Sequence, residues 1–411
     1  MAPRRPWLRF CFLLSALAGS SLLLPVTAQA ADRPKRVILF QIDNLHYEAP
    51  EKLKLPNVLA LAAAGTRVEE AYVPIPWHQT TGDYGQAHLT SLPNPVTFAG
   101  TLFLRPKQKM IQSSFTGVTA HIANSEAYAS LNPGFRVVKL DTKLRDEQVL
   151  AQVKEVYGAK NPPVFSRIVL QDANNQGGYP VSIAAPGTPW KNDIYAEGSP
   201  FIKEVREADA LLGEFVAFLK EKKLWDDTLF ILHADGASRV GWHPVMFEDS
   251  ERIPLIFVGP GVEKGKTIPY AENIDIVPTI AKWMGVRHPN PDGGTGRVLE
   301  ELAPGVQPPE TPRYLKRFNQ GVREFLTLSS RMRLESGRHP RYDIALMQVA
   351  NKHNAKLLFH GIDRIMDWHE AGSLKNLVET NERVLQCLNS LVTQETRPQE
   401  KVKTPRELGC W

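Results

Sequence analysis

The chain has 411 residues, of which 43% are hydrophobic and 23% are charged, and this ordinary globular composition is sufficient to bury a large core. The formal net charge is +5, but Arg4, Arg5 and Arg9 lie in a segment that we expect to be removed, and their loss leaves +2. No block of Lys and Arg interrupts the sequence, which argues against a nucleic-acid-binding protein.

Residues 1–30 have the pattern of a secretory signal peptide. The three arginines precede an apolar run from Phe10 to Val26 and the sequence Ala28-Gln29-Ala30, the small-x-small pattern after which signal peptidase cuts. The alternative is a retained anchor helix, but the run is short for the ~20 apolar residues of a bilayer span. No later segment of the sequence has the length and apolarity of a span. We therefore predict a periplasmic or secreted protein that begins at Ala31.

Short apolar runs alternate with helical patterns through the first part of the mature chain. Val37 to Ile42 is typical of a buried parallel strand, and Leu55 to Gly65 has helical spacing and a glycine stop. The longest amphipathic helix is predicted over residues 201–224. Two more strands are predicted at Leu229–Leu232 and Ile253–Val258. This alternation predicts an α/β fold with a mostly parallel central sheet and helices on both faces.

The proline-rich residues 303–312 predict a surface connection. We therefore divide the mature chain into an α/β domain, residues 31–302, and a small C-terminal α+β subdomain with its tail, residues 303–411. Within this subdomain Phe325–Leu328 and Lys356–Phe359 are candidate strands, and the pattern from Leu374 to Val392 predicts a final helix.

Two cysteines, Cys387 and Cys410, remain after the signal segment. A disulfide between them would be favoured in an oxidising compartment. Two unpaired thiols are the alternative, which sequence alone does not exclude.

Two of the predicted strands end in an acidic residue. Asp43 follows VILFQI and Asp235 follows LFILHA, and ligands of open parallel sheets bind at the carboxyl ends of strands. Two carboxylates brought close together need a cation or a proton between them. With Asn44 and a hydroxyl group they would form an oxygen-rich shell for Ca²⁺ or Mg²⁺. The alternative is that both acids cap the helices that follow, and these positions alone favour neither interpretation.

The order of these segments resembles the sulfatase family of the alkaline phosphatase superfamily over nearly the whole mature chain. VILFQIDN resembles the first strand with its metal-binding acids, TTGDYGQAHLTSLPNP the nucleophile loop, and DALLGEFVAFLKEKKLWDDTLFILHADG the elements that carry the second metal motif. The resemblance implies an α/β fold and a metal-dependent hydrolase or transferase of phosphate or sulfate esters. The implied substrate is a small anionic ester, a glycan or a lipid headgroup.

The resemblance places the nucleophile at Thr81, where sulfatases have a cysteine or serine that becomes formylglycine. Threonine is similar to the nucleophile of the phosphodiesterase and phosphotransferase branches, so Thr81 favours phosphate chemistry. An ordinary loop threonine is the alternative, and Thr80 beside it leaves the assignment open. His243 falls where the family often has a histidine that faces the anion, and it would either assist the leaving group or cap the next loop.

His233 lies two residues before Asp235, so both side chains face the same side of a strand. As a further ligand, His233 would shift the preference of the site toward Zn²⁺. A hydrogen-bonded interior histidine is the interpretation that we favour.

Several positions depart from the family pattern. Asn44 replaces a carboxylate, Gly236 provides no ligand, and Gly85 replaces an arginine. The family's Lys-x-His and middle histidine motifs fall on residues 124–126 and 175–178. These changes support an alternative function, a catalytically degenerate protein that keeps the fold and binds a glycan, a lipid headgroup or a protein partner.

Overall fold

The computed structural model describes residues 33–73, 89–91, 107–242, 247–290, 296–309, 314–352, 374–395 and 407. All of them belong to one unit of the chain, Asp32–Trp411. The predicted signal segment, residues 1–30, lies outside the described residues.

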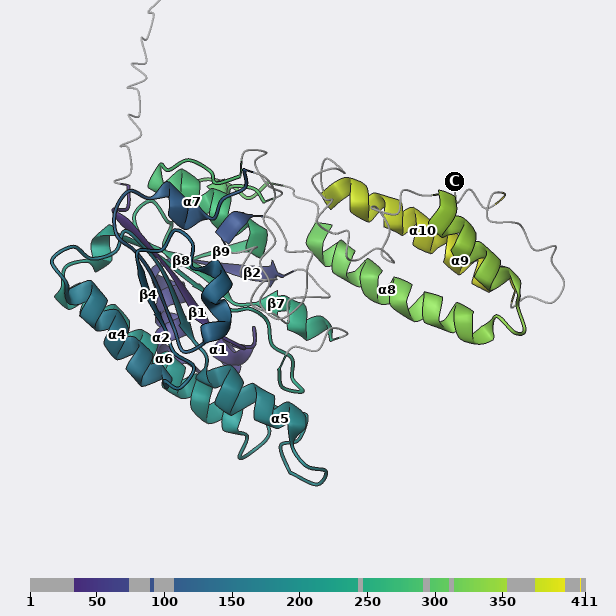
Figure 1. The fold of residues 1–411 in the computed structure, drawn as a ribbon, viewed down its shortest axis with the longest axis horizontal. Coiled ribbons are helices and arrows are strands. Elements are labelled where there is room, and N and C mark those ends of the chain that lie inside the picture. The colour runs from purple at the N-terminus through teal and green to yellow at the C-terminus, as the bar shows by residue number, and fades with distance from the viewer. Residues whose placement is uncertain are drawn as a thin grey trace, which may run out of the picture. The chain divides into compact units, whose positions relative to one another are not determined.

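Among the described residues, nine strands form one sheet in the order β4-β3-β5-β1-β6-β8-β2-β7, with β9 beside β2 (Figure 1). The strands are β1 (Arg36–Ile42), β2 (Thr66–Tyr72), β3 (Thr119–Ala123), β4 (Val137–Leu140), β5 (Phe165–Leu170), β6 (Thr228–His233), β7 (Arg252–Ile253), β8 (Leu255–Val258) and β9 (Lys266–Glu272). Strands β4, β3, β5, β1 and β6 are parallel, whereas β8 is antiparallel to both β6 and β2. The expected mostly parallel α/β sheet is confirmed.

Helices cover both faces of this sheet. α2 (Pro56–Ala64), α4 (Asp146–Gly158) and α6 (Pro200–Glu221) pack together on one face, and α7 (Ile276–Met284) lies on the other (Figure 1). Because both faces are covered, every residue of β1, β5 and β6 is buried. The short helix α1 (Ala49–Lys52) follows β1, and α5 (Tyr179–Ile183) follows a π-helical turn, Ala173–Gly178.

Proline divides the third strand that we expected. The apolar run at residues 253–258 forms β7 and β8, which are separated by Pro254, because proline has no N–H to donate to a neighbouring strand. Both strands pair with β2, and β8 pairs with β6 as well.

The C-terminal part contains three described helices, α8 (Tyr314–Glu335), α9 (Arg341–Lys352) and α10 (Leu374–Glu395). The predicted final helix is confirmed by α10. The strand expected at Phe325–Leu328 is wrong, because these residues lie inside α8. The buried residues Phe318, Val322, Phe325 and Leu328 are three or four positions apart, which is the period of a helix face. Lys356–Phe359 lies outside the described residues.

These helices have a hydrophobic cluster of their own, which also includes Tyr72, Tyr270 and Ile274 from the α/β part. Cys387 on α10 is disulfide-bonded, and its partner lies outside the described residues. The boundary between residues 302 and 303 stays a prediction.

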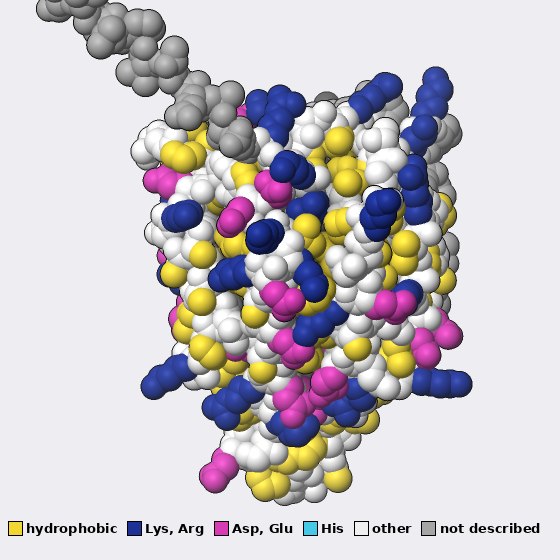
Figure 2. Space-filling view, turned by 90° about the vertical axis from the view of Figure 1, so that its left-hand side faces the viewer, with side chains coloured by type: hydrophobic (Ala, Val, Ile, Leu, Met, Phe, Trp, Pro, Cys, Tyr) yellow, Lys and Arg dark blue, Asp and Glu magenta, His cyan; other side chains and the backbone are white. Residues whose placement is uncertain are grey.

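The face of the molecule drawn in Figure 2 carries mixed charge. Positive and negative side chains are interspersed on this face, in agreement with the small formal charge of the sequence. In the part of the chain that the structure describes, no helix combines the length and the apolarity needed to cross a membrane.

Candidate functional site

The acids that follow β1 and β6 meet at the carboxyl edge of the sheet. Asp43 comes directly after β1 and Asp235 two residues after β6, and both are buried, with 1% and 0% exposure. The two carboxyl groups lie close enough for each to shift the pKa of the other. The backbone N–H of Asn44 donates to Oδ1 of Asp235 at 2.7 Å. The structure therefore brings Asp43, Asn44 and Asp235 together, and their role as metal ligands stays a prediction.

Three donors hold Asp43 in place. Its Oδ2 accepts hydrogen bonds from the Tyr128 hydroxyl at 2.7 Å, from Gln171 Nε2 at 2.9 Å and from Gln41 Nε2 at 3.0 Å. Tyr128 comes from a 3-10 turn, Glu126–Leu131, Gln171 follows β5, and Gln41 belongs to β1. One carboxylate oxygen is thus engaged by the protein, which leaves the other oxygen for a further partner.

The side chain of Asn44 is buried beside the carboxyl pair. Its backbone is left-handed, with a φ of 60°, a conformation that asparagine tolerates better than most residues. Neither polar atom of its side chain has a hydrogen-bond partner among the described residues. Gly178 makes room for this amide, because a Cβ at position 178 would lie 1.7 Å from Asn44 Nδ2. An unpartnered buried amide calls for an explanation, and a bound cation provides one.

Burial controls the ionisation of the pair. Burial raises the pKa of Asp43, whereas the hydrogen bonds from Tyr128 and Gln171 and the charge of Arg167 lower it. Burial also raises the pKa of Asp235 well above its usual value, and the neighbouring charge of Asp43 raises it further. Two such carboxyl groups are stable together only with a shared proton or a cation between them.

The residues present fit a hard divalent cation with few protein ligands. Asp43, Asn44 and Asp235 offer only oxygen atoms at this edge, which suits Ca²⁺ or Mg²⁺. Within the described ranges, no group of three or more His, Cys, Asp and Glu side chains is arranged to hold a metal. Any further ligands would therefore be amide, hydroxyl or water oxygens, or residues outside those ranges.

A buried arginine lies behind the site. Arg167 on β5 donates to Gln41 Oε1 at 2.9 Å, contacts His121 Nε2 at 2.8 Å, and lies over the ring of Tyr128, 4.4 Å from its centroid. Gln41 and Tyr128 in turn donate to Asp43. This network links a permanent positive charge to the carboxyl pair, and our sequence reasoning missed it. Its only sequence signal is an arginine within the apolar strand FSRIVL.

His233 lies in the interior of the sheet, opposite Gln41 in the β1–β6 register. Its Nδ1 lies 3.3 Å from the carbonyl oxygen of Ala234. Burial and the charge of Arg167 lower the pKa of His233 to about 3, so its imidazole is neutral at physiological pH. These contacts support the interpretation as an interior histidine, while a role as a metal ligand stays a prediction.

Asn124 and Asp209 have structural contacts. Asn124, where the family's Lys-x-His motif falls, donates to Asp146 Oδ1 at 2.8 Å and accepts from the backbone of Gln171 at 3.0 Å. It thereby holds the loop that carries Gln171. Asp209 on α6 accepts from the backbone N–H groups of Asn57 and Val58 at the start of α2.

Thr81, His243 and Gly85 lie outside the described residues. None of the distances above involves Thr81 or His243. The roles of Thr81 as nucleophile and of His243 at the leaving group therefore stay predictions.

Residues 101–286 match the family model described as Sulfatase. PehA of Trinickia caryophylli, a multifunctional alkaline phosphatase superfamily protein, is 34% identical over 113 residues, which are 25% of this chain and 21% of PehA. The choline-sulfatase of Rhizobium meliloti (strain 1021) is 30% identical over 91 residues, 21% of this chain and 18% of that enzyme. The matches thus span about a fifth of the length of these curated relatives.

A solved structure has a similar fold. The phosphonate monoester hydrolase of Agrobacterium radiobacter superposes with a TM-score of 0.51 over 68% of this chain and 79% of that chain, at 17% identity. At this identity the likeness concerns the fold alone.

Proposed function

Because the chain is a sulfatase-like member of the alkaline phosphatase superfamily, we propose that it is an exported, metal-dependent hydrolase or transferase of phosphate or sulfate esters. The observation that carries this proposal is the burial of Asp43 and Asp235 at one edge of the sheet, beside an Asn44 amide that has no partner among the described residues. Members of this superfamily are generally metal-dependent. The substrate that we propose is a small anionic ester, a glycan ester or a lipid headgroup.

In this proposal Asp43, Asn44 and Asp235 hold one divalent metal, Ca²⁺ or Mg²⁺, while Zn²⁺ is the alternative if His233 also binds. A metal bound there would neutralise the carboxyl pair and polarise an ester oxygen. Tyr128, Gln41 and Gln171 would orient Asp43, since all three donate to its Oδ2.

Thr81 is the proposed nucleophile. Its deprotonated hydroxyl would attack the phosphorus atom, and the bond from phosphorus to the leaving oxygen would break as His243 donates a proton to that oxygen. Water or an acceptor alcohol would then release the phosphoryl group from Thr81. A threonine is not converted to formylglycine, so phosphate esters should be better substrates than sulfate esters.

The test measures turnover of aryl phosphodiesters, phosphomonoesters and sulfates with Ca²⁺, Mg²⁺ or Zn²⁺ in the wild type, Thr81→Ala and Thr80→Ala. We expect Thr81→Ala to lose many orders of magnitude in rate, because the covalent step requires its hydroxyl. Thr80→Ala is the matched control and should keep most of the activity. Activity that persists in Thr81→Ala would contradict the assignment of the nucleophile.

A second function, binding without turnover, is favoured by a different observation. Gly236 offers no ligand where the family has a side chain, and three protein donors already engage Oδ2 of Asp43. A folded wild-type protein that binds metal but turns over none of the three ester classes would favour this function. The proposed ligands are then a glycan, a lipid headgroup or a protein partner.

A further inference from the structure

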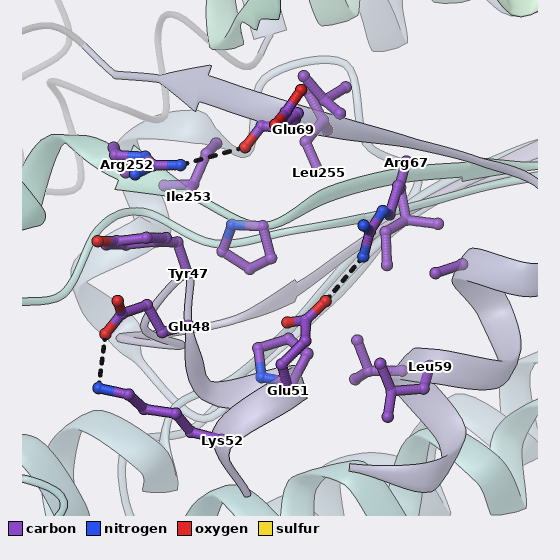
Figure 3. Close-up of a pocket in the computed structure, with 16 residues that line it drawn as sticks. Tyr47, Glu48, Glu51, Lys52, Leu59, Arg67, Glu69, Arg252, Ile253 and Leu255 are labelled. Atoms are coloured by element: carbon purple, nitrogen blue, oxygen red, sulfur yellow. Dashed lines mark hydrogen bonds and ion pairs between the residues drawn. The ribbon is translucent and has the colours of Figure 1, made fainter. Parts of the chain in front are cut away.

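A cavity lies apart from the carboxyl pair. A cavity of about 350 Å³ is lined by α1, α2 and the strands β2, β7 and β8 (Figure 3). Its volume falls within the range of small-molecule sites, roughly 300–1,000 Å³. The inner wall is apolar and includes Val58, Leu59, Ala62, Val68, Ile253 and Leu255.

Two ion pairs stand at the rim of this cavity. Lys52 Nζ lies 2.8 Å from Glu48, and Arg67 lies 2.7 Å from Glu51; both contacts are drawn in Figure 3. Because each of these cations already has a carboxylate partner, neither offers an uncompensated charge to a ligand.

Arg252 differs from the other two cations of the rim. Its guanidinium stacks on the ring of Tyr47, 4.0 Å from the centroid, and one N–H donates to the backbone carbonyl of Glu69 at 3.2 Å (Figure 3). Its Nε is buried and has no hydrogen-bond partner in the described ranges. In the described part of the chain no carboxylate lies within ion-pair distance of it. A guanidinium has five N–H donors, so Arg252 keeps both charge and donors for a ligand.

We propose that this cavity binds a small amphiphilic anion, with an apolar alkyl or aryl body against the inner wall and one carboxylate on Arg252. Removal of apolar surface from water would favour entry of the body. The fork of the guanidinium matches the two oxygens of a carboxylate. Among the described residues of the rim, Arg252 is the cation without an ion-pair partner, so its charge favours an anionic head group over a neutral or a cationic one. The cavity is separate from the proposed metal site, because no residue of the carboxyl pair lines it.

The experiment titrates octanoate, octanol and octylammonium into the mature chain by calorimetry. These probes share an alkyl body and differ only in the charge of the head. We expect saturable binding of one octanoate per chain, octanol weaker by about tenfold or more, and no saturable binding of octylammonium. Tighter binding of phenylpropanoate than of octanoate would assign an aryl body, and the reverse an alkyl body, and either result supports the proposal.

Arg252→Gln should weaken octanoate binding by about tenfold or more, because it removes the positive charge and the paired N–H donors of the guanidinium. Arg67→Gln is the matched control, since this rim arginine is already paired, and it should change the affinity by less than about threefold. Ala62→Phe should abolish binding by filling the cavity, and it provides a second test if Arg252→Gln does not fold. The proposal is overturned by equal binding of octanol and octanoate, by wild-type affinity in Arg252→Gln, or by no saturable octanoate binding.

Discussion

At the scale of single residues, the carboxyl pair gives the most direct prediction. Replacing Asp43 or Asp235 by Asn should lower the metal content of the purified protein and reduce the rise in melting temperature that Ca²⁺ or Mg²⁺ causes. The physical reason is that a bound metal stabilises the folded state by mass action, and each change removes a charged ligand. Elemental analysis and thermal denaturation with and without metal measure both effects.

Asp209→Asn is the matched control for this experiment. Asp209 is buried, but its carboxylate accepts from the N-terminal backbone of α2. Its loss should destabilise the protein by about 1 kcal/mol, as for other helix caps, and leave the response to metal unchanged. The metal site would be disproved if carefully prepared wild-type protein contains no metal and added Ca²⁺, Mg²⁺ and Zn²⁺ leave its melting temperature unmoved.

Gly178 provides a second residue-scale prediction. Its φ of −69° is ordinary for a helix, so alanine would be acceptable there except for the clash with Asn44 Nδ2 at 1.7 Å. Gly178→Ala should therefore displace the Asn44 amide, cost about 1–3 kcal/mol through overpacking and weaken metal binding. Thermal denaturation with and without Ca²⁺ measures both effects.

The matched control is Gly158→Ala at the end of α4, where a Cβ meets nothing within 4 Å. This change should leave the metal response intact. Equal metal responses in the two variants would show that the Asn44 amide does not take part in binding.

These residues also show how far sequence predicts a site. Asp43 and Asp235 were predictable because each ends an apolar strand, and the ends of adjacent parallel strands meet. Gly178, Tyr128 and Arg167 were not, because their importance depends on contacts with residues more than eighty positions away. Asn44 was predicted as a ligand in place of a carboxylate, and nothing in the sequence indicated that its backbone N–H also donates to Asp235.

At the scale of elements, the junction of β9 and α8 contains a buried acid pair. Oε1 of Glu272 accepts from the Tyr270 hydroxyl at 2.6 Å and from the backbone N–H of Leu315, in the first turn of α8, at 2.8 Å. Asp275 accepts from the backbone of Glu272 and of Arg297. Burial and the charge of Asp275 raise the pKa of Glu272 to about 8, and burial raises the pKa of Asp275 to about 6.

Because the pKa of Glu272 is raised, we expect this group to make the folded protein less stable as pH rises. A carboxyl group whose pKa is raised by folding binds its proton more tightly in the folded state. The contribution of Glu272 to the free energy of unfolding is therefore complete below its unfolded pKa of ~4.3. This contribution is lost as pH rises through the folded pKa near 8. Glu272→Gln keeps an acceptor for Tyr270 and Leu315 but does not ionise. We expect the stability of this variant relative to wild type to increase from about pH 5 to about pH 9.

Denaturant unfolding of both proteins across this range provides the measurement, and the difference between them isolates residue 272 from the other titrating groups. Curves that stay parallel from low to high pH would contradict the prediction.

The elements themselves were largely predictable. The helix expected over residues 201–224 is α6, and the final helix is α10, because long runs of helical period identify a buried stripe. The four residues Phe325–Leu328 were too few to distinguish a strand from a turn of helix. Only the longer run of α8, with its buried residues three and four apart, does so.

At the scale of the whole molecule, export is the first prediction. The apolar run and the sequence Ala28-Gln29-Ala30 predict cleavage after Ala30. N-terminal sequencing of protein recovered from the periplasm or the medium should therefore begin at Ala31. Exported material that still begins at Met1 would contradict this prediction and favour a retained anchor.

Removal of the signal segment would determine which cysteine can form the disulfide with Cys387. Cys387 is disulfide-bonded, and the sequence contains only two other cysteines, Cys11 and Cys410. If the signal segment is removed, Cys11 leaves with it, so Cys410 is the only partner that the mature chain can provide. Such a bond would form in the oxidising compartment that export implies, and it would tie the tail to α10.

Intact-mass spectrometry of the mature protein tests both statements together. Without reductant, the mass should be that of a monomer beginning at Ala31 and lighter by two hydrogen atoms than the reduced chain. Proteolysis should release a peptide pair that joins Cys387 to Cys410, and Cys410→Ser should remove this pair and expose one free thiol. A pair that joins Cys387 to Cys11 would exclude signal removal. A bond to Cys387 of a second chain would instead make the disulfide a link between two copies.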